Sequence, residues 1–162
     1  MTTEINEKHL LLLADGLEKV PQSQFDMHEY RQREKDSGEF TVCTFVSKND
    51  CGTIGCALGH APLIPGLEPI KDDFNCHANG DLINLMWDRY CMRVFGIASR
   101  YINSPAWTFL FYGRWRHFDN TPQGAAKRIR FLVKHGRPPV DRLEYASEFN
   151  EALKVYEKEL EE

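Results

Sequence analysis

Residues 121–136, TPQGAAKRIRFLVKHG, decide the fold because they predict a helix with both ends defined. Threonine can cap the first turn of a helix, and a following proline fits the first helical position. Gly136 and the prolines after it end the pattern. Three-to-four-residue spacing divides the helix into an inward face with Ala125, Ile129, Leu132 and Val133, and a basic face with Lys127, Arg130, Lys134 and Arg137.

Similar signals on both sides of this stretch predict further helices. A helix is predicted over about residues 4–19, because leucines recur at helical spacing before Pro21. Ser104 and Pro105 predict a helix toward Tyr112, and a last helix is predicted over about residues 147–161. Two more helices are expected, one with Thr53 as its N-cap that ends before Pro62, and one over residues 82–95 with Asp81 as its cap and Gly96 after its end.

We therefore predict a mainly α fold with five to six helices. Residues 40–46 are rich in β-branched side chains, which predicts a short β-hairpin near residues 40–47. The length of 162 residues suits a single compact domain over residues 1–162. Its core is expected over about residues 25–137, between the N-terminal and C-terminal helices.

Composition indicates a soluble globular protein. Hydrophobic residues make up 42% of the chain and charged residues 27%. The longest apolar run near the start, residues 10–14, is far shorter than the roughly 20 residues of a membrane span. The first residues lack the basic segment of a signal peptide, and the count of five cysteines is odd. We expect a cytoplasmic protein with reduced thiols and no membrane partner.

Charge is unevenly distributed along the chain. The net charge of −4 disfavours a general nucleic-acid binder, including a helix-turn-helix protein. Residues 113–137 nevertheless carry a charge of +6, and residues 147–162 carry −4. The basic stretch could therefore meet an anionic partner, or the acidic end could neutralise it.

Four short motifs in order are FDM at residues 25–27, CGTIGCALGHA at 51–61, FGI at 95–97 with LFYGRW at 110–115, and TPQGAA at 121–126. This order resembles a family of small uncharacterised proteins of tailed bacteriophages and some bacteria. The resemblance covers roughly residues 25–137, with an apparent insertion at residues 32–50 and Gly124 interrupting the helix start. It implies a phage or bacterial setting, and it carries no catalytic residue and no activity.

The basic segment is the leading candidate for a binding site. Free backbone N–H groups at the start of the 121–136 helix could bind a phosphate, which arginine grips with two hydrogen bonds. Trp115, Phe118 and Tyr112 could stack on a base. The predicted ligand-binding residues are Arg114, Trp115, Arg116, His117, Lys127 and Arg130. The simpler alternative is that the aromatic residues belong to the core and the basic residues to a solvated surface.

The cysteine and histidine residues suggest two other kinds of site, a structural zinc site and a catalytic cysteine. Cys51, Cys56, His60 and Cys76 could hold a structural zinc ion, although the gap of four between Cys51 and Cys56 is long for a zinc motif. A helix N-terminus lowers a thiol pKa, so Cys56 could instead be a nucleophile, with His117 or His135 as its base. The default interpretation is that the thiols are buried packing residues, with no cofactor.

From these patterns we predict a non-enzymatic accessory protein that binds a host protein or a small anionic, nucleotide-like ligand. A cysteine-dependent enzyme and a zinc domain are the alternatives. The amphipathic last helix could also support a homo-oligomer.

Overall fold

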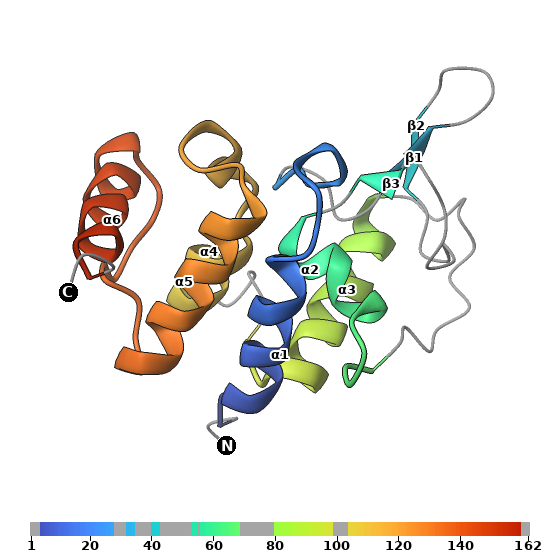
Figure 1. Cartoon of the computed structure of the whole chain (residues 1–162), viewed down its shortest axis with the longest axis horizontal. Helices are drawn as coiled ribbons and strands as arrows, with labels where there is room; N and C mark the ends of the chain where they lie inside the picture. Colours follow the sequence, from blue (N-terminus) through green and yellow to red (C-terminus); the bar gives the residue numbers. More distant parts are fainter. Residues whose placement is uncertain are drawn as a thin grey trace.

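The computed structural model of the chain describes residues 4–27, 32–34, 40–42, 53–54, 56–68, 80–98 and 104–159, with the backbone alone for residues 32–34, 40–42, 53–54 and 80–86. The predicted mainly helical fold is confirmed. In Figure 1 the C-terminal helix lies at one end of the molecule and a small sheet at the other. The described helices are α1 (Glu7–Leu17), α2 (Ala57–His60), α3 (Gly80–Phe95), α4 (Pro105–Phe111), α5 (Pro122–His135) and α6 (Ala146–Lys158).

Helices α4 and α5 begin where their Ser-Pro and Thr-Pro signals predict. The Ser104 hydroxyl accepts a hydrogen bond from the Trp107 N–H, and the Thr121 hydroxyl accepts one from the Gly124 N–H. Each cap satisfies a backbone donor that has no partner inside the helix. Gly136 ends α5 in the left-handed conformation, with φ of 70°. Local sequence therefore fixes both ends of the helix against which α1, α4 and α6 pack.

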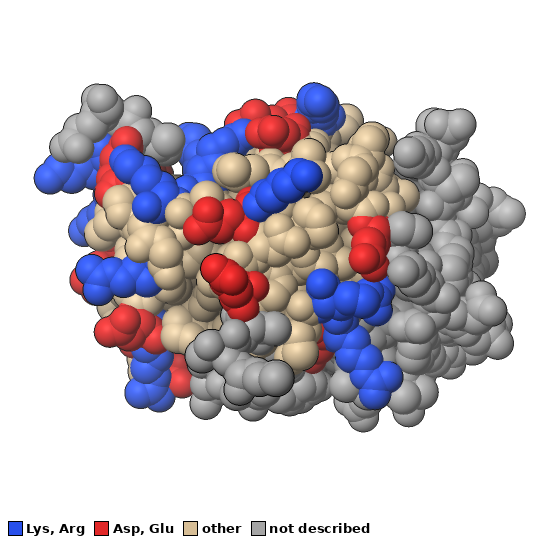
Figure 2. Space-filling view, turned by 90° about the horizontal axis from the view of Figure 1, so that it is seen from below, with Lys and Arg blue, Asp and Glu red and all other residues tan. Residues whose placement is uncertain are grey.

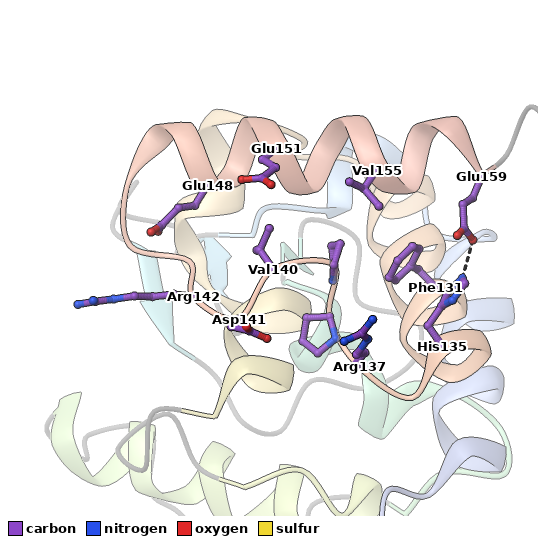
Figure 3. A pocket seen from close by; sticks show the side chains of 12 residues that line it. Phe131, His135, Arg137, Val140, Asp141, Arg142, Glu148, Glu151, Val155 and Glu159 are labelled. Carbon is purple, nitrogen blue, oxygen red and sulfur yellow. Dashed lines mark hydrogen bonds and ion pairs between the residues drawn. The ribbon is translucent and has the colours of Figure 1, made fainter.

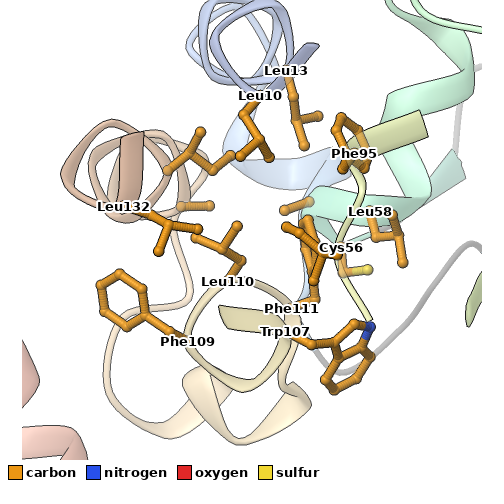
Figure 4. Packing of buried hydrophobic residues seen from close by; sticks show 14 of the residues in the cluster. Leu10, Leu13, Cys56, Leu58, Phe95, Trp107, Phe109, Leu110, Phe111 and Leu132 are labelled. Atoms are coloured by element: carbon orange, nitrogen blue, oxygen red, sulfur yellow. The ribbon is translucent and has the colours of Figure 1, made fainter. Parts of the chain in front are cut away.

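Helix α5 packs along α1 through apolar faces. Leu10, Leu13 and Leu17 of α1 are completely buried, and so is Ile129 on the predicted inward face of α5. At the flank of this contact, the Arg130 guanidinium reaches carboxylates on α1. In Figure 4, the side chains of Leu10 of α1, Leu110 of α4 and Leu132 of α5 point toward one another. One apolar cluster thus joins the N-terminal helix to the centre of the chain.

Several predicted boundaries shift. Helix α1 begins at Glu7 rather than near residue 4, because Asn6 is its cap. Helix α3 begins at Gly80, so Asp81 lies inside it rather than before it. Thr53 does not cap α2, because it lies in a strand, and the Cys56 side chain caps α2 instead. Helix α6 spans Ala146–Lys158 within the described residues.

The sheet consists of three short antiparallel segments in the order β2-β1-β3. These are β1 (Gln32–Glu34), β2 (Phe40–Val42) and β3 (Thr53–Ile54). In the register of the hairpin, Gln32 lies opposite Val42 and Glu34 opposite Phe40. Of the hairpin predicted near residues 40–47, only Phe40–Val42 lie within the described part, and they pair with β1 earlier in the chain.

The end of α3 contacts the start of α1. The Asn6 N–H donates to the Phe95 carbonyl at 2.9 Å, and His9 Nδ1 lies 2.7 Å from the Val94 carbonyl oxygen. The chain can approach this closely because Gly96, with φ of 69°, has no side chain. A Cβ atom at that position would lie 2.3 Å from the Glu4 carbonyl oxygen.

We expect Gly96→Ala to destabilise the fold by about 3 kcal/mol, because the left-handed conformation and the backbone clash both oppose alanine. Gly136→Ala is the matched control, since Gly136 has a similar φ of 70° but nothing within 4 Å of the added atom. It should cost only about 1–2 kcal/mol, the price of the left-handed conformation alone. Urea unfolding of both variants measures the difference, and equal losses would contradict the role of the α1–α3 contact.

Candidate functional site

Trp115, a predicted stacking residue, is not accessible to a ligand. It lies in a 3-10 helix, Gly113–His117, and its side chain is completely buried. Its ring meets Phe149 of α6 edge to face, with 5.0 Å between the centroids. Phe118 stacks on the same Phe149 ring at 4.7 Å. The structure therefore gives no support to stacking of Trp115 on a base, because these aromatic residues attach α6 to the core.

The arginines of the predicted binding site point to different partners. Arg114 donates to the Glu144 carbonyl before α6, and Arg116 lies 3.8 Å from the Asp26 carboxylate. The Arg130 guanidinium lies 2.7 Å from Asp15 of α1 and 2.6 Å from Glu18, the residue that follows α1. The remaining predicted residues, His117 and Lys127, are exposed. The structure therefore does not bring these arginines together around one ligand.

Figure 2 shows Lys and Arg interspersed with Asp and Glu on the face that it draws. Among the described residues of that face, no broad patch of positive charge is visible. A phosphate backbone needs such a concentration of cations. This face therefore gives no support to a nucleic-acid partner.

The N-terminus of α5 is already occupied by a carboxylate of the protein. The Thr121 hydroxyl donates to Asp119 Oδ1 at 2.7 Å while it accepts from the Gly124 N–H at 2.9 Å. A Cβ atom on Gly124 would lie 1.8 Å from Asp119 Oδ2, so only glycine leaves room for this carboxylate. This arrangement disfavours a phosphate at the helix start, because Asp119 supplies the negative charge that the helix end attracts.

Asp119 also holds two buried side chains. Tyr156 of α6 donates its hydroxyl to Asp119 Oδ2 at 2.7 Å, and Arg128 Nη1 lies 3.3 Å from the same oxygen. The Arg128 side chain is completely buried, and its guanidinium lies 4.2 Å from the centre of the Trp115 ring. We call Asp119, Thr121, Arg128, Tyr156 and Trp115 the Asp119 cluster.

Burial controls the ionisation of this cluster. It lowers the pKa of Arg128, while Tyr156 and Asp119 oppose that shift. It raises the pKa of Tyr156 well above its usual range, although Arg128 acts in the opposite direction. The tyrosine therefore stays a neutral donor to Asp119 at physiological pH. The sequence carried a signal for this arrangement, since Arg128 falls on the inward stripe of α5, three residues after Ala125 and four before Leu132.

Cys56 and His60, from the cysteine and histidine alternatives, are buried. Cys56 is 2% exposed, and its sulfur accepts the Gly59 N–H of α2 at 3.5 Å. The His60 ring stacks on Phe25, and its Nε2 lies 2.7 Å from the Gln24 carbonyl oxygen. A buried thiol is not open to a substrate from solution, and His117 is exposed. This disfavours the pairing of Cys56 with His117 as catalytic residues.

The predicted zinc ligands Cys51 and Cys76 lie outside the described residues. Among the described residues, no group of three or more His, Cys, Asp or Glu side chains could hold a metal ion. The zinc site therefore stays a prediction. Within the same part of the chain, no helix is long and apolar enough to cross a membrane.

A groove lies between the end of α5, the following loop and α6. Its volume is about 600 Å³, which is within the range of ligand-binding pockets. In Figure 3, Val155 of α6 and Val140 of the loop point into it, with Phe131 of α5 beside them. The side chains that line it are Phe131, His135, Arg137, Pro138, Pro139, Val140, Asp141, Arg142, Glu148, Glu151, Val155 and Glu159. It is the strongest candidate for a binding site in the described part of the chain.

A carboxylate makes hydrogen bonds at each end of the groove, Glu148 in the first turn of α6 and Glu159 directly after it. Glu148 accepts the N–H groups of Glu144 and Tyr145 at 2.5 and 2.9 Å, and these bonds lower its pKa. Glu159 lies 2.6 Å from His135 Nε2, and this hydrogen bond lowers the pKa of Glu159. These contacts join α6 to the loop at one end of the groove and to α5 at the other.

The chain matches no protein-family model, no curated protein and no solved structure.

We expect Asp119→Ala to destabilise the protein by about 3–5 kcal/mol, because it leaves the Arg128 charge buried without its carboxylate. Arg130→Ala is the control, since it removes ion pairs that are exposed to solvent and should cost only about 1 kcal/mol. Urea unfolding at neutral pH measures both. Similar losses would show that Arg128 does not depend on Asp119.

Stability should also depend on the Tyr156 hydroxyl at high pH. The unfolded chain releases the tyrosine proton near pH 10, whereas burial in the folded protein retains it. Stability from this hydroxyl is therefore complete below about pH 10 and falls as the pH rises further. We expect the difference in unfolding free energy between wild type and Tyr156→Phe to shrink between pH 9 and pH 11, as measured by urea titrations. A constant difference would contradict a buried, neutral tyrosine.

Proposed function

We propose that this protein is a non-enzymatic accessory protein that binds another protein through the groove between α5 and α6. The groove itself carries the proposal. Val155, which is 38% exposed, lies there together with Phe131 and Val140, so the groove contains a continuous apolar surface. An apolar surface with a charged rim is typical of protein-binding sites.

Two other functions have less support. A small anionic ligand would need the start of α5, where Asp119 already lies against the first turn. An enzyme based on Cys56 would need an accessible thiol, whereas Cys56 is buried. Self-association through α6 also has less support. Phe149 and Tyr156, which belong to the apolar face of this helix, are buried within the molecule.

The partner that we propose is a host protein in the bacterial cytosol. This setting comes from the resemblance of residues 25–137 to small phage proteins. A protein of this kind acts by occupying a surface of its target. The groove is a suitable contact because its walls come from a helix and a proline-containing loop, both of which are already ordered.

We expect Val155→Asp to abolish retention of a host protein, since it places an additional charge in the apolar part of the groove. Leu11→Asp is the matched control, because Leu11 of α1 is 39% exposed and does not line the groove. Immobilised wild type and both variants are incubated with bacterial lysate, and the retained proteins are quantified by mass spectrometry. A protein retained by wild type and Leu11→Asp but lost with Val155→Asp supports the proposal. Equal retention by all three would contradict it.

A further inference from the structure

We propose that the groove binds a peptide segment of its partner in which a large apolar side chain is flanked by lysine or arginine. This inference rests on the proposed function and specifies the chemistry of the partner. Three observations carry it: the apolar surface inside the groove, the charges that line it, and the positions of the charges that have no partner within the described residues.

The apolar surface supplies the position for one anchoring side chain. Phe131, Val140 and Val155 come from three different segments and meet inside the groove (Figure 3). Protein complexes are commonly stabilised by one or two large side chains buried in such a pocket. A volume of about 600 Å³ is large enough for a leucine or aromatic residue together with the adjacent peptide backbone.

The charges that line the groove favour a cationic partner. Four carboxylates and two guanidinium groups line it, which gives −2 with neutral histidine. Glu148 and Glu159 are held by the backbone and by His135, as described above. The carboxylates of Asp141 and Glu151 make no hydrogen bond or ion pair within the described residues. In an unbound groove, these two carboxylates are available to pair with a lysine or arginine of the partner.

The two arginines do not cancel this preference. Arg142 points away from the groove in Figure 3, and its guanidinium lies 2.6 Å from Glu144. Arg137 makes no ion pair within the described residues and lies toward the His135 end, whereas Asp141 lies toward the opposite end (Figure 3). The unpaired charges are therefore separated along the groove. A bound segment would place its cation beside Asp141 and Glu151, and a carbonyl or carboxylate beside Arg137.

Synthetic peptides test this chemistry with the full-length protein. The probe is a peptide of 12 residues with a central leucine and lysines on both sides. In one comparison peptide glutamate replaces the lysines, and in another serine replaces the leucine. Fluorescence anisotropy measures binding at low salt. We expect the lysine–leucine peptide to bind, both comparison peptides to bind at least about tenfold more weakly, and added salt to weaken the first complex.

Substitutions in the groove then locate the contact. Glu151→Gln and Asp141→Asn should each weaken binding of the lysine–leucine peptide about two- to fivefold, as expected for exposed charge pairs. Glu157→Gln is the control, because Glu157 lies on the same helix outside the groove and should leave binding unchanged. Glu151→Lys should reverse the preference toward the glutamate peptide. All four variants change exposed side chains and should therefore remain folded. Thermal melting verifies this.

The outcomes of these experiments distinguish failure of this inference from failure of the proposed function. Equal binding of the lysine and glutamate peptides, or no effect of Glu151→Lys, overturns the inference of a cationic segment. If Val155→Asp still abolishes capture of a host protein, the proposed function survives that failure. If sedimentation shows a dimer of wild type that Val155→Asp dissociates, the occupant is a second copy of this chain, and the inference is wrong.

Discussion

The structure depends on the Asp119 carboxylate at the start of α5. This side chain accepts hydrogen bonds from Thr121 and from Tyr156 and faces the buried guanidinium of Arg128. Placing a charge in an aromatic core is unfavourable unless an opposite charge and hydrogen bonds accompany it. Asp119 receives both, together with the positive end of the helix dipole. The anion that the helix terminus attracts is therefore part of the protein.

The Asp119 cluster determines where α6 lies, and thereby shapes the groove. Tyr156 and Phe149 come from α6, whereas Asp119 and Trp115 come from the segment before α5. On another side of α5, Arg130 pairs with carboxylates of α1. Helix α5 is consequently attached to both the N-terminal and the C-terminal helix. The residues left exposed between α5 and α6, above all Val155, form the surface that we propose for a partner.

Local signals in the sequence predict much of the fold. The Ser104-Pro105 and Thr121-Pro122 starts are confirmed, and the glycines after α3 and α5 have the left-handed conformation that ends a helix. These features depend on neighbouring residues only. Thr53 shows the limit, because strand pairing with Arg33 overrides its preference for a cap. The mainly helical fold could thus be predicted, but not each boundary.

The candidate site could not be predicted in the same way. Arg128 falls on the inward stripe of α5, but nothing in the sequence indicates its buried partner Tyr156, which lies on a different helix 28 positions later. In the sequence, Gly124 is a residue that destabilises a helix. In the structure, the absence of a side chain at Gly124 leaves room for the Asp119 carboxylate. The groove brings together Phe131, Val140 and Val155, which share no sequence motif. Each of these features arises from tertiary contacts, which composition and spacing do not specify.

Hydrogen exchange of the α6 amides tests most directly whether the Asp119 cluster holds α6 in place. The comparison is between wild type and Tyr156→Phe, which removes only the hydroxyl that donates to Asp119. A hydrogen bond to a charged group contributes about 1.5–3 kcal/mol, so we expect α6 to exchange roughly tenfold faster or more while α1 remains as protected as before. An unchanged rate in α6, or an equal increase in α1 and α6, would contradict this account.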